Sequence, residues 1–204
     1  ATATVDRAYV NHKFGERVSV KAGRFGQAFG GGLAFDGTFD GVQFNAGNDK
    51  VNFQAAYGYA VSGVGIEPNE DIHFDGLNKL ENATNTYVSL SGKVGKHVNL
   101  GGFYDRVNQS KDTSATATAL QQYKNIYGFN TDVNFDKVWV GGEWLKASNV
   151  EKSTAWTAGV GYGNYDIKKQ GTWDAKVQYF NQKENSPIID TTWAQKYKAG
   201  NKGW

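Results

Sequence analysis

Residues 51–61 read Val-Asn-Phe-Gln-Ala-Ala-Tyr-Gly-Tyr-Ala-Val, with an apolar or aromatic residue at every odd position and polar or small residues between them. Successive side chains of a β-strand point to opposite faces, so this stretch predicts a strand with one apolar face. A tilted membrane-crossing strand needs about 9–11 residues, but a soluble sheet with one buried face shows the same alternation. This stretch alone does not distinguish a membrane-crossing strand from a strand of a soluble sheet. The distinction depends on how often the pattern recurs and on the lengths of the connections between strands.

The same alternation recurs along the whole chain and predicts nine further strands. No helix is predicted beyond a short helical turn at residues 114–122. Arg24 interrupts the alternation, which predicts a β-bulge or the end of a membrane-crossing band near Gly23. The nine strands are expected at residues 3–14, 18–26, 39–47, 84–94, 98–106, 123–135, 138–147, 154–164 and 172–182.

The predicted connections alternate in length: those after odd-numbered strands are tight, and those after even-numbered strands, such as the glycine-rich 26–37 and the acidic 62–83, are longer. Transmembrane barrels have this asymmetry, with short periplasmic turns and longer outer loops, whereas Greek-key sandwiches mix their connection lengths. We therefore expect an all-β, antiparallel transmembrane β-barrel of about ten strands over residues 1–204. Lys-Gly-Trp at 202–204 resembles the opening of another strand, so we expect a fragment of a larger barrel.

The composition excludes several classes of function. Lys and Arg number 22 against 20 Asp and Glu, a balance that does not favour a nucleic-acid partner. The chain has no apolar run of about 18 residues for a transmembrane helix, and no cysteine for disulfide or thiolate chemistry. Only 39% of residues are hydrophobic, which suits a barrel with a water-filled interior better than a large dry core.

Tyrosine and tryptophan residues, among them Tyr57, Trp144 and Trp156, fall on the apolar alternate positions of the predicted strands. In a bilayer these positions face lipid, and Tyr or Trp near a strand end lies at the level of the headgroups. The alternative is a half-buried soluble sheet, in which aromatic residues are also common.

Three short segments carry a resemblance to a known family: Gly-Arg-Phe-Gly at 23–26, Gly-Gly-Leu-Ala-Phe-Asp-Gly at 31–37 and Phe-Asp-Gly-Val at 39–42. Together they resemble a stretch of bacterial porins, most of all the OmpM-type SLH-domain porins of diderm Firmicutes (Negativicutes). The resemblance implies a homotrimer of barrels in the bacterial outer membrane, in contact with lipid and lipopolysaccharide. It also implies passive diffusion of small hydrophilic solutes without a cofactor, and an envelope-tethering segment that is not visible in this sequence.

The polar alternate positions predict a pore lining. Basic residues of the first two strands face one way, and the longest internal connection is acidic. If that connection folds inward, opposed basic and acidic walls would form a selectivity filter; alternatively its acids face solvent or bind divalent cations with lipopolysaccharide. The predicted constriction residues are Arg7, Lys13, Lys21, Arg24, Glu67, Glu70, Asp71 and Asp75.

Other kinds of site are less well supported. A metal site needs three or four convergent ligands, and His73 is a lone histidine among acidic residues, so no metal site is predicted. A barrel hydrolase needs a histidine with a positioned carboxylate, and none of the three histidines follows an acidic residue, so we do not expect an enzyme. A barrel with a structural or envelope-tethering role, and a surface β-domain that binds glycans through exposed aromatic residues, remain as alternatives.

Overall fold

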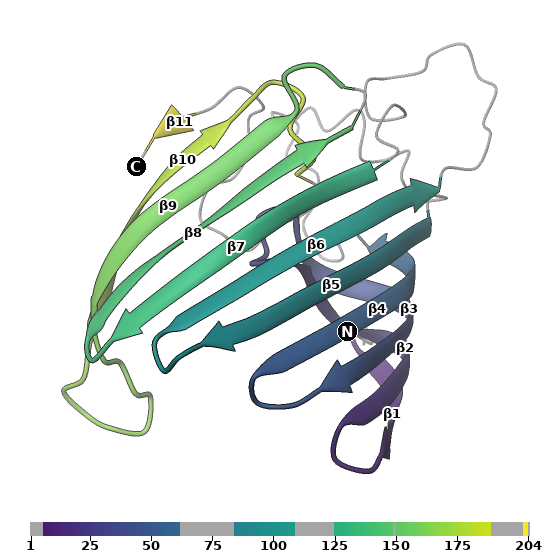
Figure 1. Cartoon of the computed structure of the whole chain (residues 1–204), viewed down its shortest axis with the longest axis horizontal. Coiled ribbons are helices and arrows are strands. Elements are labelled where there is room, and N and C mark those ends of the chain that lie inside the picture. The colour runs from purple at the N-terminus through teal and green to yellow at the C-terminus, as the bar shows by residue number, and fades with distance from the viewer. Residues whose placement is uncertain (1–5, 62–83, 109–124, 149, 189–201, 204) are drawn as a thin grey trace, which may run out of the picture.

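The computed structural model describes residues 6–61, 84–108, 125–148, 150–188 and 202–203, and all regular structure within them is β-strand. One sheet contains eleven strands, each hydrogen-bonded to the next along the chain (Figure 1). The strands are β1 (Ala8–Phe14), β2 (Val18–Phe29), β3 (Phe35–Gly47), β4 (Val51–Val61), β5 (Thr84–Val94), β6 (Val98–Asn108), β7 (Asn125–Phe135), β8 (Val138–Ala147), β9 (Thr154–Gly163), β10 (Asp174–Gln182) and β11 (Lys202–Gly203).

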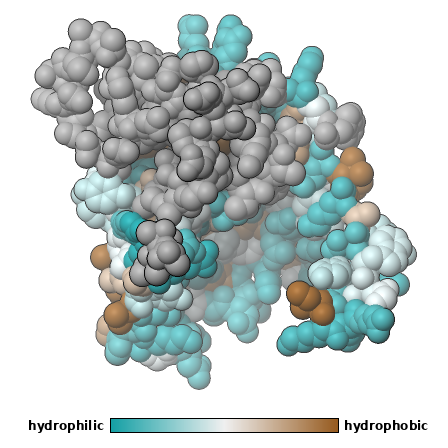
Figure 2. Space-filling view, turned by 180° about the vertical axis from the view of Figure 1, so that it is seen from behind, coloured by the Kyte–Doolittle hydropathy of each residue, from teal (hydrophilic) through white to brown (hydrophobic). Residues whose placement is uncertain are grey.

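All neighbouring strands are antiparallel, and the sheet is open: within the described residues, β1 pairs only with β2 and β11 only with β10. The sheet curves strongly, so that it has a convex face toward the viewer of Figure 1 and a concave face behind it. From behind, hydrophilic side chains gather around the hollow of the concave face (Figure 2). The predicted all-β antiparallel arrangement is thus confirmed, while closure into a barrel is not part of the described sheet.

The ten predicted strands are all present, and Lys202–Gly203 adds the expected eleventh by pairing with Phe180 and Asn181. Two expectations about β2 and β3 were wrong. Most of the predicted connection 26–37 is strand, and only residues 30–34 separate β2 from β3. Of the two alternatives expected near Gly23, the bulge is wrong, because the pairing of β2 with both neighbours runs through this residue without an insertion. The helical turn expected at 114–122 lies outside the described residues.

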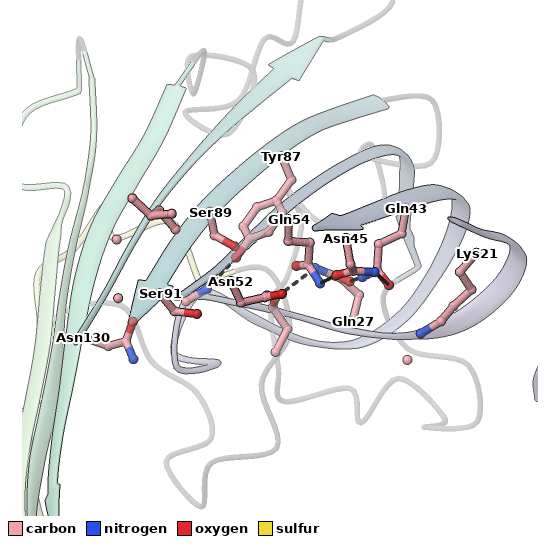
Figure 3. A pocket seen from close by; sticks show the side chains of 16 residues that line it. Lys21, Gln27, Gln43, Asn45, Asn52, Gln54, Tyr87, Ser89, Ser91 and Asn130 are labelled. Carbon is pink, nitrogen blue, oxygen red and sulfur yellow. Dashed lines mark hydrogen bonds between the residues drawn. The ribbon is translucent and has the colours of Figure 1, made fainter. Parts of the chain in front are cut away.

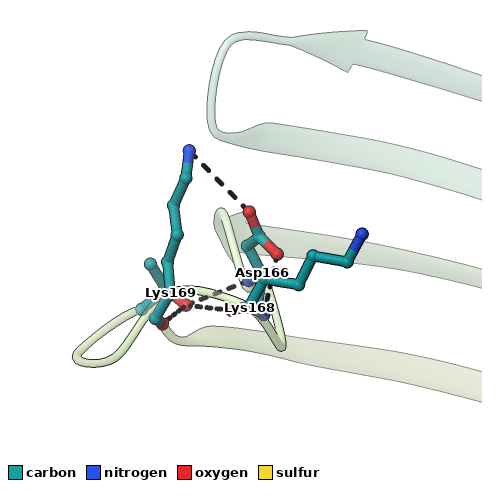
Figure 4. A network of polar contacts seen from close by, with 4 residues as sticks. Asp166, Lys168 and Lys169 are labelled. Carbon is teal, nitrogen blue, oxygen red and sulfur yellow. Dashed lines mark hydrogen bonds and ion pairs between the residues drawn. The ribbon is translucent and has the colours of Figure 1, made fainter.

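The connection between β9 and β10, residues 164–173, is also longer than the tight turn predicted there. Asp166 organises it: its carboxylate accepts a hydrogen bond from the Lys168 amide at 3.0 Å and lies 3.7 Å from the Lys169 ammonium (Figure 4). Its carbonyl accepts a hydrogen bond from the Lys169 amide at 2.8 Å. The alternation of connection length is therefore broken at β2–β3 and at β9–β10.

Large apolar side chains are exposed on one face of the sheet, and several amide side chains are buried on the other. In β3, Gln43 is 3% exposed, whereas its neighbours Val42 and Phe44 are 49% and 38% exposed. The same order holds in β4, where Phe53 and Tyr57 are exposed. Large apolar side chains thus cover the convex face, and polar side chains point into the concave one.

The concave face also carries a cluster of buried apolar residues. The expectation of a water-filled interior did not include such a cluster. Its members are completely or almost completely buried, and the largest group of them comes from β2, β3 and the turn between them. Phe29 stacks on Tyr87 of β5 with ring centroids 4.5 Å apart, and Tyr87 in turn stacks on Phe103 of β6 at 6.1 Å. The cluster includes Phe25, Phe29, Leu33, Phe35, Phe39, Tyr87, Phe103, Ile126 and Leu145.

A row of glycines explains how β2 and β3 reach this cluster. Gly23, Gly41 and Gly58 are register partners on β2, β3 and β4. A Cβ on Gly41 would lie 2.2 Å from the carbonyl oxygen of Tyr57, and Gly23 has φ +122°. Only glycine permits such close backbone approach and such a conformation. The row therefore lets the distal parts of β2 and β3 bend over the concave face.

Candidate functional site: a polar cavity on the concave face

The contacts of Gln27 establish that the β2–β3 hairpin folds back. Gln27 is paired in register with Gly37, yet its side chain hydrogen-bonds Gln43, six residues further along β3. Six residues of extended strand span about 20 Å, which no pair of side chains can bridge. The distal hairpin must therefore return over the sheet, beyond the glycine row.

The turn at the tip of this hairpin is held by β8. The Glu143 carboxylate accepts hydrogen bonds from the amides of Gly31 at 3.1 Å and Leu33 at 3.0 Å. The Gly30 amide donates to the Tyr87 hydroxyl at 3.1 Å. Glu143 is only 4% exposed, and each of its two carboxyl oxygens accepts one of these backbone amides. These bonds fix the turn across the concave face.

Beside the folded hairpin lies a cavity of about 460 Å³, whose walls come from β2 to β7 (Figure 3). Most of its described side chains are amides and hydroxyls, and among the described residues Lys21 is the one charged residue that lines it. The polar lining residues are Lys21, Gln27, Gln43, Asn45, Asn52, Gln54, Tyr87, Ser89, Ser91 and Asn130.

Four of these amides form a closed ring of hydrogen bonds. Gln27 donates to Gln54 at 2.8 Å, Gln54 donates to Asn45 at 3.1 Å, and Asn45 donates to Gln43 at 3.2 Å. Gln43 completes the ring by donating to Gln27. The ring connects three strands and fixes the orientation of every amide in it.

Of the predicted constriction residues, Lys21 is the one that lines this cavity. Its ammonium lies 5.4 Å from the ring centre of Tyr9 and 5.1 Å from that of Phe25, within cation–π range. Lys13 shares this face of the strands, being two register positions from Lys21, but it is exposed and does not line the cavity. Arg7 is exposed beside Asp6, with 3.8 Å between the guanidinium and the carboxylate.

Arg24 lies on the opposite face of β2 from Lys21, because the alternation of β2 continues without interruption. Its guanidinium donates two hydrogen bonds to Asp40 of β3, at 2.7 and 2.6 Å. Arg24 is therefore not part of the lining of the cavity. The predicted acidic residues Glu67, Glu70, Asp71 and Asp75 lie outside the described residues.

The residues that sequence reasoning missed are the amide ring and Glu143. Gln43, Asn45 and Gln54 lay on predicted polar faces, but nothing in the sequence marked them as mutual partners. Gln27 was assigned to a connection. Glu143 was on the polar face of its predicted strand. Its partners are backbone amides, which every residue except proline has, so the sequence could not indicate them.

The described residues offer no group of three His, Cys, Asp or Glu side chains that could hold a metal ion. His97 contacts the carbonyl oxygen of Asn134 at 2.7 Å, and His73 lies outside the described residues. The described part of the chain also contains no helix long and apolar enough to span a membrane. No protein-family model matches this sequence, and no curated protein matches it either.

Proposed function

We propose that this chain forms a porin-like channel, a water-filled pore through which small hydrophilic solutes and ions diffuse passively across the bacterial outer membrane. The observation that carries the proposal is the inverted polarity of the sheet. Exposed Val, Phe, Tyr and Leu side chains cover the convex face while amides are buried on the concave face. Apolar surface left in water is unfavourable by about 25 cal/mol per Å², so a hydrocarbon environment suits this surface better.

The concave face supports the channel proposal in two further ways. The described residues that line the cavity present neutral polar groups and one lysine, which suits hydrated solutes. The folded β2–β3 hairpin, held by Glu143, occupies part of the concave space, so it would narrow the passage. Porins commonly combine a lipid-facing apolar band with a polar interior of this kind.

Lipid, lipopolysaccharide and two further copies of the chain are the partners that the proposal implies. A homotrimer would be visible by chemical crosslinking in mild detergent. A structural barrel with an envelope-tethering role would insert into membranes but conduct no ions. A surface β-domain that binds glycans would remain soluble without detergent.

Cysteine labelling tests which face meets lipid. The chain has no cysteine, so single-cysteine variants report one position each. Ser91 lines the cavity, and Val160 is exposed on the convex face. In intact liposomes we expect S91C to react with a charged, membrane-impermeant thiol reagent, while V160C reacts only after denaturation. Equal reaction of both variants in intact liposomes would refute the membrane assignment.

Planar-bilayer recordings test the channel itself. The full chain should give stepwise ion conductance, and liposomes that contain it should swell in solutions of small sugars but not of large polymers. Protein that inserts and resists heat denaturation in gels, yet conducts no ions, would refute the channel and favour a structural barrel.

A further inference from the structure

The ring of amides has spare hydrogen-bonding capacity of a particular kind. Each side-chain amide has two N–H groups and two oxygen lone pairs, and the ring uses one N–H and one lone pair of each member. The second N–H of Gln27 donates to the carbonyl of Ala28 at 3.1 Å. Within the described part of the chain, one donor on each of Gln43, Asn45 and Gln54, and one acceptor on every member, are left beyond the ring.

The ring also holds these groups in fixed directions. Because every amide donates to the next in one sense around the ring, no member can rotate without breaking two hydrogen bonds. A ligand would therefore meet alternating donors and acceptors that are already oriented, which lowers the entropy lost on binding. Ser89, Ser91 and Asn52 extend the same neutral polar surface along the cavity.

The chemistry of this wall matches hydroxyl groups better than charges. A hydroxyl donates and accepts at once, as each amide does. A charged solute would lose its hydration without a counter-charge on the ring, and Lys21 is the one charged side chain among the described residues of the lining. The volume of about 460 Å³ lies within the range of about 300–1,000 Å³ that is usual for small-molecule sites.

We propose that the amide ring is a binding site for neutral polyhydroxylated solutes, that is, a mono- or disaccharide in transit. This inference rests on the proposed channel function and names its substrate class. A site within a channel must release its solute as readily as it captures it, so we expect weak, millimolar affinity. Gln54 is the member to test, because its hydrogen bonds to Gln27 and Asn45 join β4 to both β2 and β3.

The test is the reduction of single-channel current by glucose or maltose, compared with polyethylene glycol of the same hydrodynamic size. Both solutes occupy volume, but only the sugar offers hydroxyl groups to the ring. The variants are Gln54→Leu, which removes one amide, and Gln54→Glu, which keeps the acceptor and loses the donor to Asn45. The matched control is Gln178→Leu, which removes an amide from β10 outside the cavity.

We expect saturable sugar block in the wild type and in the Gln178 control, and at least a fivefold weaker affinity in both Gln54 variants. Conductance should persist in all of them. Equal effects of sugar and polyethylene glycol on a conducting wild-type channel would overturn the sugar site while leaving the channel intact. Stronger block by a sugar acid, abolished by Lys21→Gln, would assign the cavity to anions instead. Absence of conductance in the wild type would refute the channel proposal itself.

Discussion

Replacing Glu143 by glutamine should release the turn between β2 and β3 without unfolding the sheet. Glutamine keeps one acceptor for the amides of Gly31 and Leu33 but presents an N–H group where the second acceptor was. One of the two hydrogen bonds is lost, because Gly31 and Leu33 each donate to a different carboxyl oxygen. Leaving a buried amide without its acceptor costs about 1–3 kcal/mol, and the two opposed N–H groups repel each other, so the combined loss is about 3 kcal/mol. Since each 1.4 kcal/mol is roughly a factor of ten, local opening of the turn should increase about 100-fold.

Amide hydrogen exchange measures this opening directly. Exchange at Gly31 and Leu33 should accelerate about 100-fold in E143Q. The Gly32 amide donates to the carbonyl of Phe29 within the same turn at 3.0 Å, so it should change much less. Glu151→Gln, in the connection after β8, is the control for a lost surface charge. Unchanged exchange at Gly31 and Leu33 in E143Q would mean that ring packing, and not Glu143, holds the turn.

Three further predictions, two of them with a matched control substitution, are tested by urea unfolding in liposomes. Gly41→Ala should destabilise by about 1–3 kcal/mol because its Cβ would meet the Tyr57 carbonyl. Gly102→Ala, whose nearest atom is 3.7 Å away, should be nearly neutral, and equal effects would contradict the glycine-row argument. Phe129→Arg, on the convex face, should lose about 2–4 kcal/mol at the bilayer midplane, whereas Asn130→Arg beside the cavity should lose less and shift ion selectivity. Asp105→Asn should raise the unfolding midpoint, because it replaces a completely buried carboxyl group by a neutral amide that can still accept the hydrogen bond from Asn85; a lower midpoint would mean that the carboxyl group itself stabilises the fold.

The strands could be predicted from the sequence because alternation is a local property. β4 and β8 were predicted with their observed bounds. The hairpin of β2 and β3 was cut short because a glycine-rich segment usually indicates a loop. Here the glycines instead allow the Glu143 carboxyl group to come close to the backbone. An added Cβ would lie 2.5 Å from a Glu143 oxygen at Gly30 and 2.8 Å from the other oxygen at Gly31.

The site was harder to predict because its contacts are not local. Lys21 could be assigned to the concave face from alternation alone. The contact of Gln27 with Gln43 arises only because the hairpin bends, and neither strand register nor spacing indicates that bend. Arg24 shows the reverse error: its charge suggested a pore residue or a broken strand, but Asp40, its cross-strand partner, satisfies it on the other face.

If the convex face lies in a membrane, the edge strands of the sheet must have hydrogen-bond partners. If hydrocarbon surrounds the convex face, unpaired backbone N–H and C=O groups on an edge strand would each be unfavourable by several kcal/mol. In the described sheet β1 and β11 each have one free edge. The channel proposal therefore requires that both edges have partners in the membrane, whether each other, further strands or another copy. The apolar surface and the edges are thus linked: the solvent that explains the exposed Val and Phe side chains is the same one that forbids an open sheet.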